Sequence, residues 1–154
     1  MRMSGGFDIE TSIMIDAPQH RVFDLVADLR AWPLWNSNDP SVERSYDGAA
    51  GQAGATARWR SRRSGAGRMR ISDIARPDRI VVQVDFDRPF RVSNVNTFTL
   101  GQEHGATSVR WSMRGPKPFV VKLLGVFVSA EKMMQGHFDT GLRRLKALAE
   151  DGVR

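Results

Sequence analysis

Side chains that could carry catalytic or metal chemistry are scarce in this 154-residue sequence. There is no cysteine, which excludes disulfides, thiolate metal sites and cysteine nucleophiles. His20, His104 and His137 have no partner at the spacing of a metal site, and the HExxH, GxSxG, GxGxxG and P-loop patterns are absent. We therefore predict no metal and no cofactor, and we expect the three histidines on the surface.

Asp73 is the carboxylate that could serve acid–base catalysis. In an alternating strand it shares a phase with Met69 and Ile71, which we expect to face the interior. Burial would raise the pKa of Asp73 and make it a candidate general base for cyclisation or dehydration. The alternative interpretation is a solvated strand end, because Asp73 stands near the end of its strand.

Two amides, Asn94 and Asn96, fall in the otherwise apolar phase of another predicted strand. A buried amide that lacks hydrogen-bond partners costs about 1–3 kcal/mol, so both side chains need partners. One interpretation is that a ligand or water supplies them, as in a small-molecule site. The other is a structural role, with hydrogen bonds to the neighbouring backbone or at a bulge.

Arginine supplies most of the positive charge, and the net charge is +6. Arginine suits planar anions such as carboxylate and phosphate. Five arginines share the predicted outer face of one hairpin: Arg58, Arg60, Arg62, Arg68 and Arg70. We favour a solvated face partly neutralised by Asp85 and Asp87 over an anionic partner. No aromatic residues alternate with these arginines, so we expect no nucleic-acid binding.

The elements that must position these residues follow from periodicity. Residues 7–16 alternate as a strand, Pro18 suits the first turn of a helix, and 32–35 end that helical region with two tryptophans. A period of two then continues to residue 114, interrupted by Gly, Pro and Asp turn signals. It predicts strands at about 42–47, 55–63, 67–75, 79–86, 91–102 and 106–114.

One hairpin register can be proposed from the alternation. Pairing 62 with 68 and 60 with 70 sets Trp59 opposite Ile71 and leaves a five-residue loop at 63–67. In this register the apolar side chains meet on one face and the arginines meet on the other.

A helical pattern occupies the C-terminal region, with Ser129 as a plausible cap and an apolar stripe that continues to Leu148. A helix over 129–150 would be about 33 Å long, enough to cross a whole sheet. The apolar segment 119–128 could be buried, could form a lid or could make a dimer contact. We favour a wall of a cavity entrance.

A single helix covers part of a wide sheet, so a curved sheet around it should leave an apolar cavity. Strand phase and the helical stripe predict its lining. The predicted ligand-binding residues are Trp35, Trp59, Met69, Ile71, Val84, Phe86, Asn94, Asn96, Trp111, Met113, Phe127, Met134 and Phe138.

Motifs spread over the whole chain match one known family. They are Ile15-Asp16-Ala17-Pro18, Val22-Phe23, Trp32-Pro33-x-Trp35, Gly67-Arg68-Met69-x-Ile71, Pro77-x-x-Ile80, Gly115-Pro116-x-Pro118-Phe119, Lys132-Met133 and Phe138-x-x-Gly141-Leu142-x-x-Leu145-Lys146. With these motifs the chain resembles the SRPBCC superfamily of START, pollen-allergen and polyketide-cyclase-like proteins, most of all its bacterial polyketide cyclase/dehydrase branch. The resemblance implies a helix-grip fold and a hydrophobic cavity, whose ligands in the family include lipids, polyketides, quinones, plant hormones and aromatic intermediates. It carries no catalytic residue over to this chain.

We predict one α+β domain over 1–154: a strand, two short helices, six more strands in a curved seven-stranded antiparallel sheet, and a long C-terminal helix. No signal-peptide core or apolar run of about 18 residues occurs, so we expect a cytoplasmic protein without membrane insertion. Its predicted partner is a small hydrophobic molecule, and homodimerisation stays open. Binding of an apolar or aromatic ligand is the favoured function. The alternatives are a cyclase or dehydratase with an inward carboxylate, and an interaction protein without a ligand.

Overall fold

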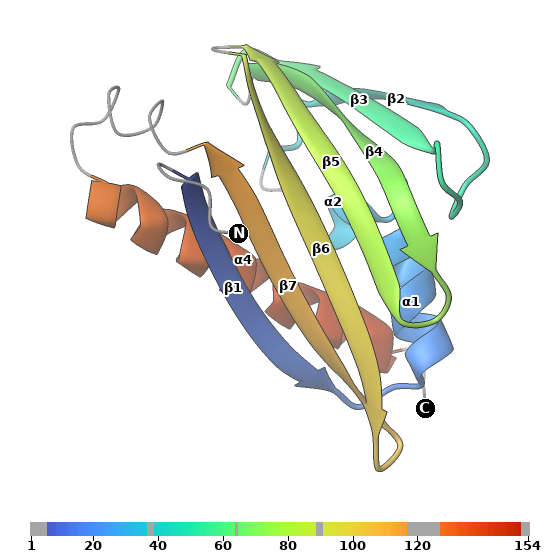
Figure 1. Ribbon diagram of the computed structural model, residues 1–154. Coiled ribbons are helices and arrows are strands. Elements are labelled where there is room, and N and C mark those ends of the chain that lie inside the picture. The colour runs from blue at the N-terminus through green and yellow to red at the C-terminus, as the bar shows by residue number, and fades with distance from the viewer. Residues whose placement is uncertain (1–5, 37–38, 64, 89–90, 117–126, 152–154) are drawn as a thin grey trace.

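The computed structural model describes residues 6–36, 39–63, 65–88, 91–116 and 127–151 (Figure 1). The predicted order of elements is confirmed. The chain forms β1 (Gly6–Ile15), α1 (Gln19–Ala27), α2 (Trp32–Trp35), β2 (Glu43–Asp47), β3 (Thr56–Ser61), β4 (Gly65–Ala75), β5 (Arg79–Arg88), β6 (Val92–Glu103), β7 (Ala106–Pro116) and α4 (Phe127–Asp151).

The seven strands make one antiparallel sheet in the order β1-β7-β6-β5-β4-β3-β2. The sheet is strongly curved, and α4 crosses it on the same side as α1 and α2 (Figure 1). The connections between β2 and β7 are too short for crossover helices, so strands that are neighbours in sequence pair as hairpins. β1 pairs with β7 and forms one edge of the sheet. This is the helix-grip α+β fold that the sequence predicted.

Aromatic side chains fix α4 and α2 against the centre of the sheet. The rings of Trp111 on β7 and Phe138 on α4 stack with centroids 3.9 Å apart and an interplanar angle of 7°. Phe98 on β6 stacks on Trp111 at 4.9 Å, and Trp32 and Trp35 meet these rings edge-on. This cluster fills the middle of the concave face, so any hollow must lie to one side of it.

Polar contacts hold the C-terminal end of α4. Arg21 on α1 donates from Nε to the carbonyl oxygen of Ala149 at 2.6 Å, which satisfies one of the free carbonyls of the last turn. The backbone N–H of Asp16 donates to Glu150 at 2.7 Å. Further along the helix, Gln135 donates to the carbonyl oxygen of Glu10 on β1 at 3.0 Å. These contacts set where the helix lies across β1.

The predicted β3–β4 register is wrong. Trp59 pairs with Gly67 instead of Ile71, and the turn closes earlier, at the pair Ser61–Gly65. Gly65 has φ 77°, a conformation that glycine adopts without strain and that allows this tighter turn. The error is four residues, an even number, so the side chains keep the faces predicted for them.

A β-bulge in β4 changes the position of Asp73. Ile71 pairs with Val82 but Asp73 pairs with Val81, so Ser72 is the extra residue. Beyond the bulge the alternation is reversed. Asp73 is therefore exposed, on the opposite face from Met69 and Ile71, and it forms an ion pair with Arg79 at 2.5 Å. The solvated strand end, rather than the inward carboxylate, is what the structure shows.

Candidate functional site

A cavity of about 620 Å³ lies between the inner face of the sheet and the helices. It opens beside the aromatic cluster, on the side of β3, β4 and β5. Its apolar wall combines the half-buried rings of Trp59 and Phe86, whose centroids are 5.3 Å apart, with methionines from β4, β7 and α4. Methionine side chains are unbranched and adapt their shape, which suits a wall that accommodates a small apolar molecule.

Ten of the thirteen predicted ligand-binding residues lie on this cavity wall, and two lie elsewhere. Trp35 and Ile71 are fully buried in the core instead, Trp35 behind the rings of Trp32 and Trp111. The side chain of Phe127 lies outside the described residues. Those on the wall are Trp59, Met69, Val84, Phe86, Asn94, Asn96, Trp111, Met113, Met134 and Phe138.

Asn94 and Asn96 form a directed chain of hydrogen bonds with Trp111. The indole N–H of Trp111 donates to Oδ1 of Asn96 at 2.9 Å, and Nδ2 of Asn96 donates to Oδ1 of Asn94 at 2.7 Å. Because an indole can only donate, it fixes the orientation of the Asn96 amide and then that of Asn94. The partners are therefore side chains, not the neighbouring backbone that one sequence interpretation proposed.

The chain of hydrogen bonds ends on the amino group of Asn94. This residue is 9% exposed and lines the cavity. Within the described parts of the chain, its Nδ2 has no acceptor, so the apolar wall presents a hydrogen-bond donor toward the space. A donor in such surroundings is what orients a ligand that carries an oxygen atom.

Sequence analysis did not identify the polar residues at the cavity mouth. Asp39 is 9% exposed, and its carboxylate accepts hydrogen bonds from the backbone N–H of Ser41 at 2.9 Å and from the hydroxyl of Ser61 at 2.9 Å. It stands in a non-periodic connection, where alternation predicts nothing. The sequence Asp39-Pro40-Ser41 could have indicated this turn. In such turns the aspartate side chain commonly accepts a hydrogen bond from the backbone N–H two residues later.

Arg44 and Arg63 are the cationic residues of the mouth. Arg44 pairs with Trp59 across β2 and β3, so both side chains leave the same face of the sheet. The alternation Val42, Arg44, Tyr46 could have identified Arg44 as inward. Arg63 is exposed in the turn after β3 and forms no ion pair within the described residues.

His137 lies on the cavity lining although it is exposed, as are His20 and His104. Partial burial and, to a smaller extent, the positive charge of Arg144 lower the pKa of His137 below its usual range. The imidazole is therefore predominantly neutral at pH 7. The mouth gains hydrogen-bonding capacity from it but little positive charge.

The cavity lacks the usual arrangement of a catalytic centre within the residues that the structure describes. Among the described lining residues Asp39 is the one carboxylate, and each of its oxygens accepts a hydrogen bond from a serine. No group of three or more His, Asp or Glu side chains that could hold a metal ion occurs among the described residues. What the geometry provides is an apolar space, one inward donor and a charged mouth.

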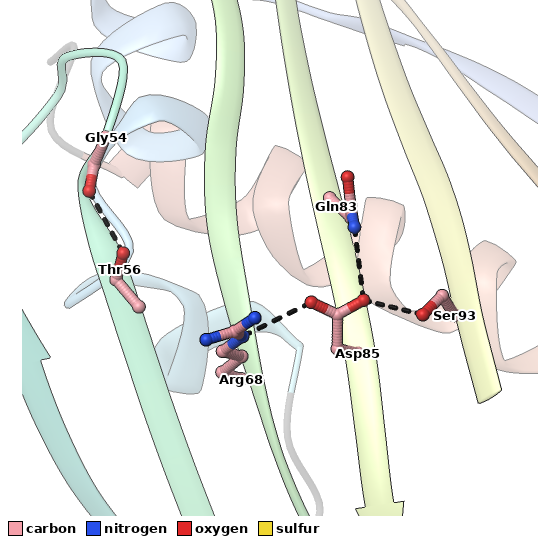
Figure 2. Close-up of polar contacts among 6 residues, drawn as sticks. All are labelled: Gly54, Thr56, Arg68, Gln83, Asp85 and Ser93. Carbon is pink, nitrogen blue, oxygen red and sulfur yellow. Dashed lines mark hydrogen bonds and ion pairs between the residues drawn. The ribbon is translucent and has the colours of Figure 1, made fainter. Parts of the chain in front are cut away.

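The outer arginine face is partly neutralised. Asp85 accepts from Ser93 at 2.6 Å, from Gln83 at 3.2 Å and from Arg68 at 3.3 Å, as Figure 2 shows on the side of the sheet away from the helices. These bonds lower the pKa of Asp85, and the Ser93 hydroxyl contributes most. Arg60 pairs with Glu43 at 2.9 Å. This face therefore resembles a solvated surface with local ion pairs.

Residues 6–150 match the family model described as polyketide cyclase/dehydrase and lipid transport. The chain belongs to this family. The resemblance to the polyketide cyclase-like branch of the SRPBCC superfamily is thereby confirmed. No curated protein matches this chain.

Solved structures share the fold of this polyketide cyclase/dehydrase family member at low sequence identity. Protein CV1439 from Chromobacterium violaceum is 18% identical over 96% of this chain and 99% of its own, with a TM-score of 0.69. The Aha1 dimer from Colwellia psychrerythraea is 16% identical over 96% and 99%, with a TM-score of 0.66. StfQ, a di-domain ARO/CYC protein of the steffimycin biosynthetic pathway, is 14% identical over 95% and 52%, with a TM-score of 0.72.

Within the described residues of this polyketide cyclase/dehydrase family member, no helix is long and apolar enough to cross a membrane.

Proposed function

We propose that this protein binds a small, mostly apolar molecule that carries an oxygen acceptor, in the cavity between the sheet and α4. The family and the cavity both support binding of an apolar ligand. The observation that carries the finer proposal is the amino group of Asn94. Trp111 and Asn96 fix its orientation, and among the described residues it has no acceptor in the apolar wall.

The energetics favour a ligand with an apolar body and one placed oxygen. Each Å² of apolar surface removed from water contributes about 25 cal/mol, so the aromatic and methionine wall supplies most of the affinity. A hydrogen bond to the Asn94 amide adds about 0.5–1.5 kcal/mol, which corresponds to roughly two- to twelvefold in affinity. The amide therefore discriminates between ligands of equal size rather than determining whether they bind.

A matched pair of probes tests the proposal. 1-Acetonaphthone and 1-ethylnaphthalene have nearly the same shape, but the first has a carbonyl oxygen where the second has a methylene group. We expect both to quench the tryptophan fluorescence of the wild-type protein, and the ketone to bind about two- to twelvefold more tightly. Asn94→Asp, which still accepts from Asn96 but has no amino group, should remove this preference for the ketone.

The control is Gln102→Leu, which changes an exposed amide on the same strand, β6, away from the cavity lining. It should leave both affinities unchanged. If neither probe binds the wild-type protein, the cavity is not a ligand site of this kind. Equal affinities for the two probes would refute the role of Asn94.

Cyclase or dehydratase activity is the second candidate, and the family description is the observation in its favour. The carboxylate considered for it, Asp73, is exposed and paired with Arg79, outside the cavity. If the protein is such an enzyme, Asp39 at the mouth is the carboxylate to test, and Asp73→Asn should leave turnover unchanged.

A further inference from the structure

The mouth of the cavity differs from its interior in charge. The interior wall is apolar apart from the amides, whereas the mouth contains Arg44, Arg63 and Asp39. Both oxygens of Asp39 already accept hydrogen bonds from serines, and His137 is predominantly neutral at pH 7. Among the lining residues that the structure describes, two guanidinium groups stand against one carboxylate, so these residues carry a net positive charge.

Arg63 is the residue that makes this charge available to a ligand. Several described arginines outside the cavity have carboxylate partners, among them Arg60, Arg68 and Arg114. Arg63 has none within the described part of the chain and yet lines the cavity. Its donors therefore stand at the opening, within reach of a group that projects from the apolar space.

The surrounding geometry gives this arginine a defined place. Arg63 follows β3, the strand of Trp59, and the ring of Trp59 meets Phe86 to form one side of the apolar wall. Arg44 extends the positive charge along that side, because it is the cross-strand partner of Trp59. A molecule lying against the two rings would thus have one end near Arg63, with the charge of Arg44 along the same side of the cavity.

We propose that the ligand is an anionic amphiphile, whose apolar body fills the cavity and whose carboxylate or phosphate is bound at the mouth by Arg63 with the support of Arg44. The inference rests on the proposed function and adds the charge of the ligand. Guanidinium groups match both anions, since two parallel N–H donors can face two oxygens.

Decanol, decanoate and decyl phosphate, titrated by calorimetry, test this proposal. The three share one chain and differ in the head group. We expect the anions to bind more tightly than decanol, with the tighter of the two identifying the head group. Their advantage should shrink when salt rises from about 20 mM to about 500 mM, because mobile ions screen an exposed charge. Decanol should be insensitive to salt.

Variants of Arg63 locate the effect. Because the side chain is exposed, Arg63→Ala should weaken the anions by about two- to fivefold and leave decanol unchanged. Arg63→Lys should keep part of the preference, since it retains the charge without the paired donors. Arg70→Ala is the matched control: it removes the same charge from the exposed outer face, where Arg70 does not line the cavity.

The outcomes separate the two proposals. If none of the three molecules binds, the proposed function itself fails. If all three bind equally and Arg63→Ala changes nothing, the cavity binds apolar molecules and the anionic head group is refuted. A loss for Arg70→Ala as large as that for Arg63→Ala would show a general charge effect and would also refute the assignment. Thermal unfolding checks that each variant is folded.

Discussion

At the scale of single residues, the close packing of Trp59 on Gly67 shapes one wall of the cavity. A Cβ atom at Gly67 would lie 2.4 Å from the carbonyl oxygen of Asp85 and 2.6 Å from Cη2 of Trp59. Such distances are far inside van der Waals contact. The indole of Trp59 can therefore lie over β4, beside Phe86, because position 67 has no side chain.

Gly67→Ala should consequently destabilise the fold and displace Trp59. We expect a loss of about 1–3 kcal/mol in the free energy of unfolding, the usual cost of overpacking a close contact. Denaturant unfolding measures the loss, and a shift of the tryptophan emission reports the movement of the ring. Unchanged stability together with an unchanged spectrum would show that the close packing of Trp59 on Gly67 is incorrect.

At the scale of elements, one part of α4 anchors the helix to the rest of the fold and another part lines the cavity. Its C-terminal turns are fixed by Arg21 and by the contact of Glu150 with Asp16. Met134 and His137, in the N-terminal half of α4, line the cavity. Between them stands Gly136, which is exposed and would meet nothing within 4 Å if it carried a Cβ.

Gly136→Ala should therefore stabilise the protein. Alanine restricts the unfolded chain more than glycine does and fits the helix without a clash, so we expect a gain of about 0.4–1 kcal/mol. Ala147→Gly, at another exposed position of α4, should lose a similar amount. Urea unfolding of the two variants checks both signs. A destabilised Gly136→Ala protein would mean that this part of the helix is not regular.

At the scale of the whole molecule, the two carboxylates and the one histidine with altered pKa values lie in three regions. Asp85 lies on the outer face, and Glu150 lies near the end of α4, where the Lys146 ammonium and the Asp16 N–H lower its pKa. His137 lies at the cavity mouth. In all three groups the folded state binds protons less readily than the unfolded chain does.

Stability should therefore fall in two steps as the pH is lowered. For His137 the loss begins as the pH falls through the unfolded value of 6.5 and continues to its lower folded pKa. For Asp85 and Glu150 it begins near the unfolded values of 3.8 and 4.5 and continues below them. Denaturant unfolding over a pH series measures both steps. His137→Gln should abolish the upper step and leave the lower one, and a pH-independent stability in the upper range would contradict the lowered pKa of His137.

The local periodicity of the sequence was enough to predict the elements and their order. A strand exposes alternate residues to opposite faces and a helix repeats every 3.6 residues, so Ile13, Val84 or Leu145 can be assigned to a face without coordinates. The same alternation placed Trp59, Met69 and Asn94 on the inner face, which is where the structure has them. Even the wrong pairing of Trp59 preserved this assignment, because the register error was an even number of residues.

Tertiary structure alone decided the features that depend on partners distant in sequence. The bulge at Ser72 moved Asp73 to the outer face, and alternation cannot reveal a single inserted residue. The hydrogen bonds from Trp111 through Asn96 to Asn94 join two strands, so their direction exists only once β6 and β7 are paired. Asp39 and Arg63 come together at the mouth because a loop and a turn meet in space. Sequence periodicity describes the faces of regular elements, and it contains no information on how irregular segments meet.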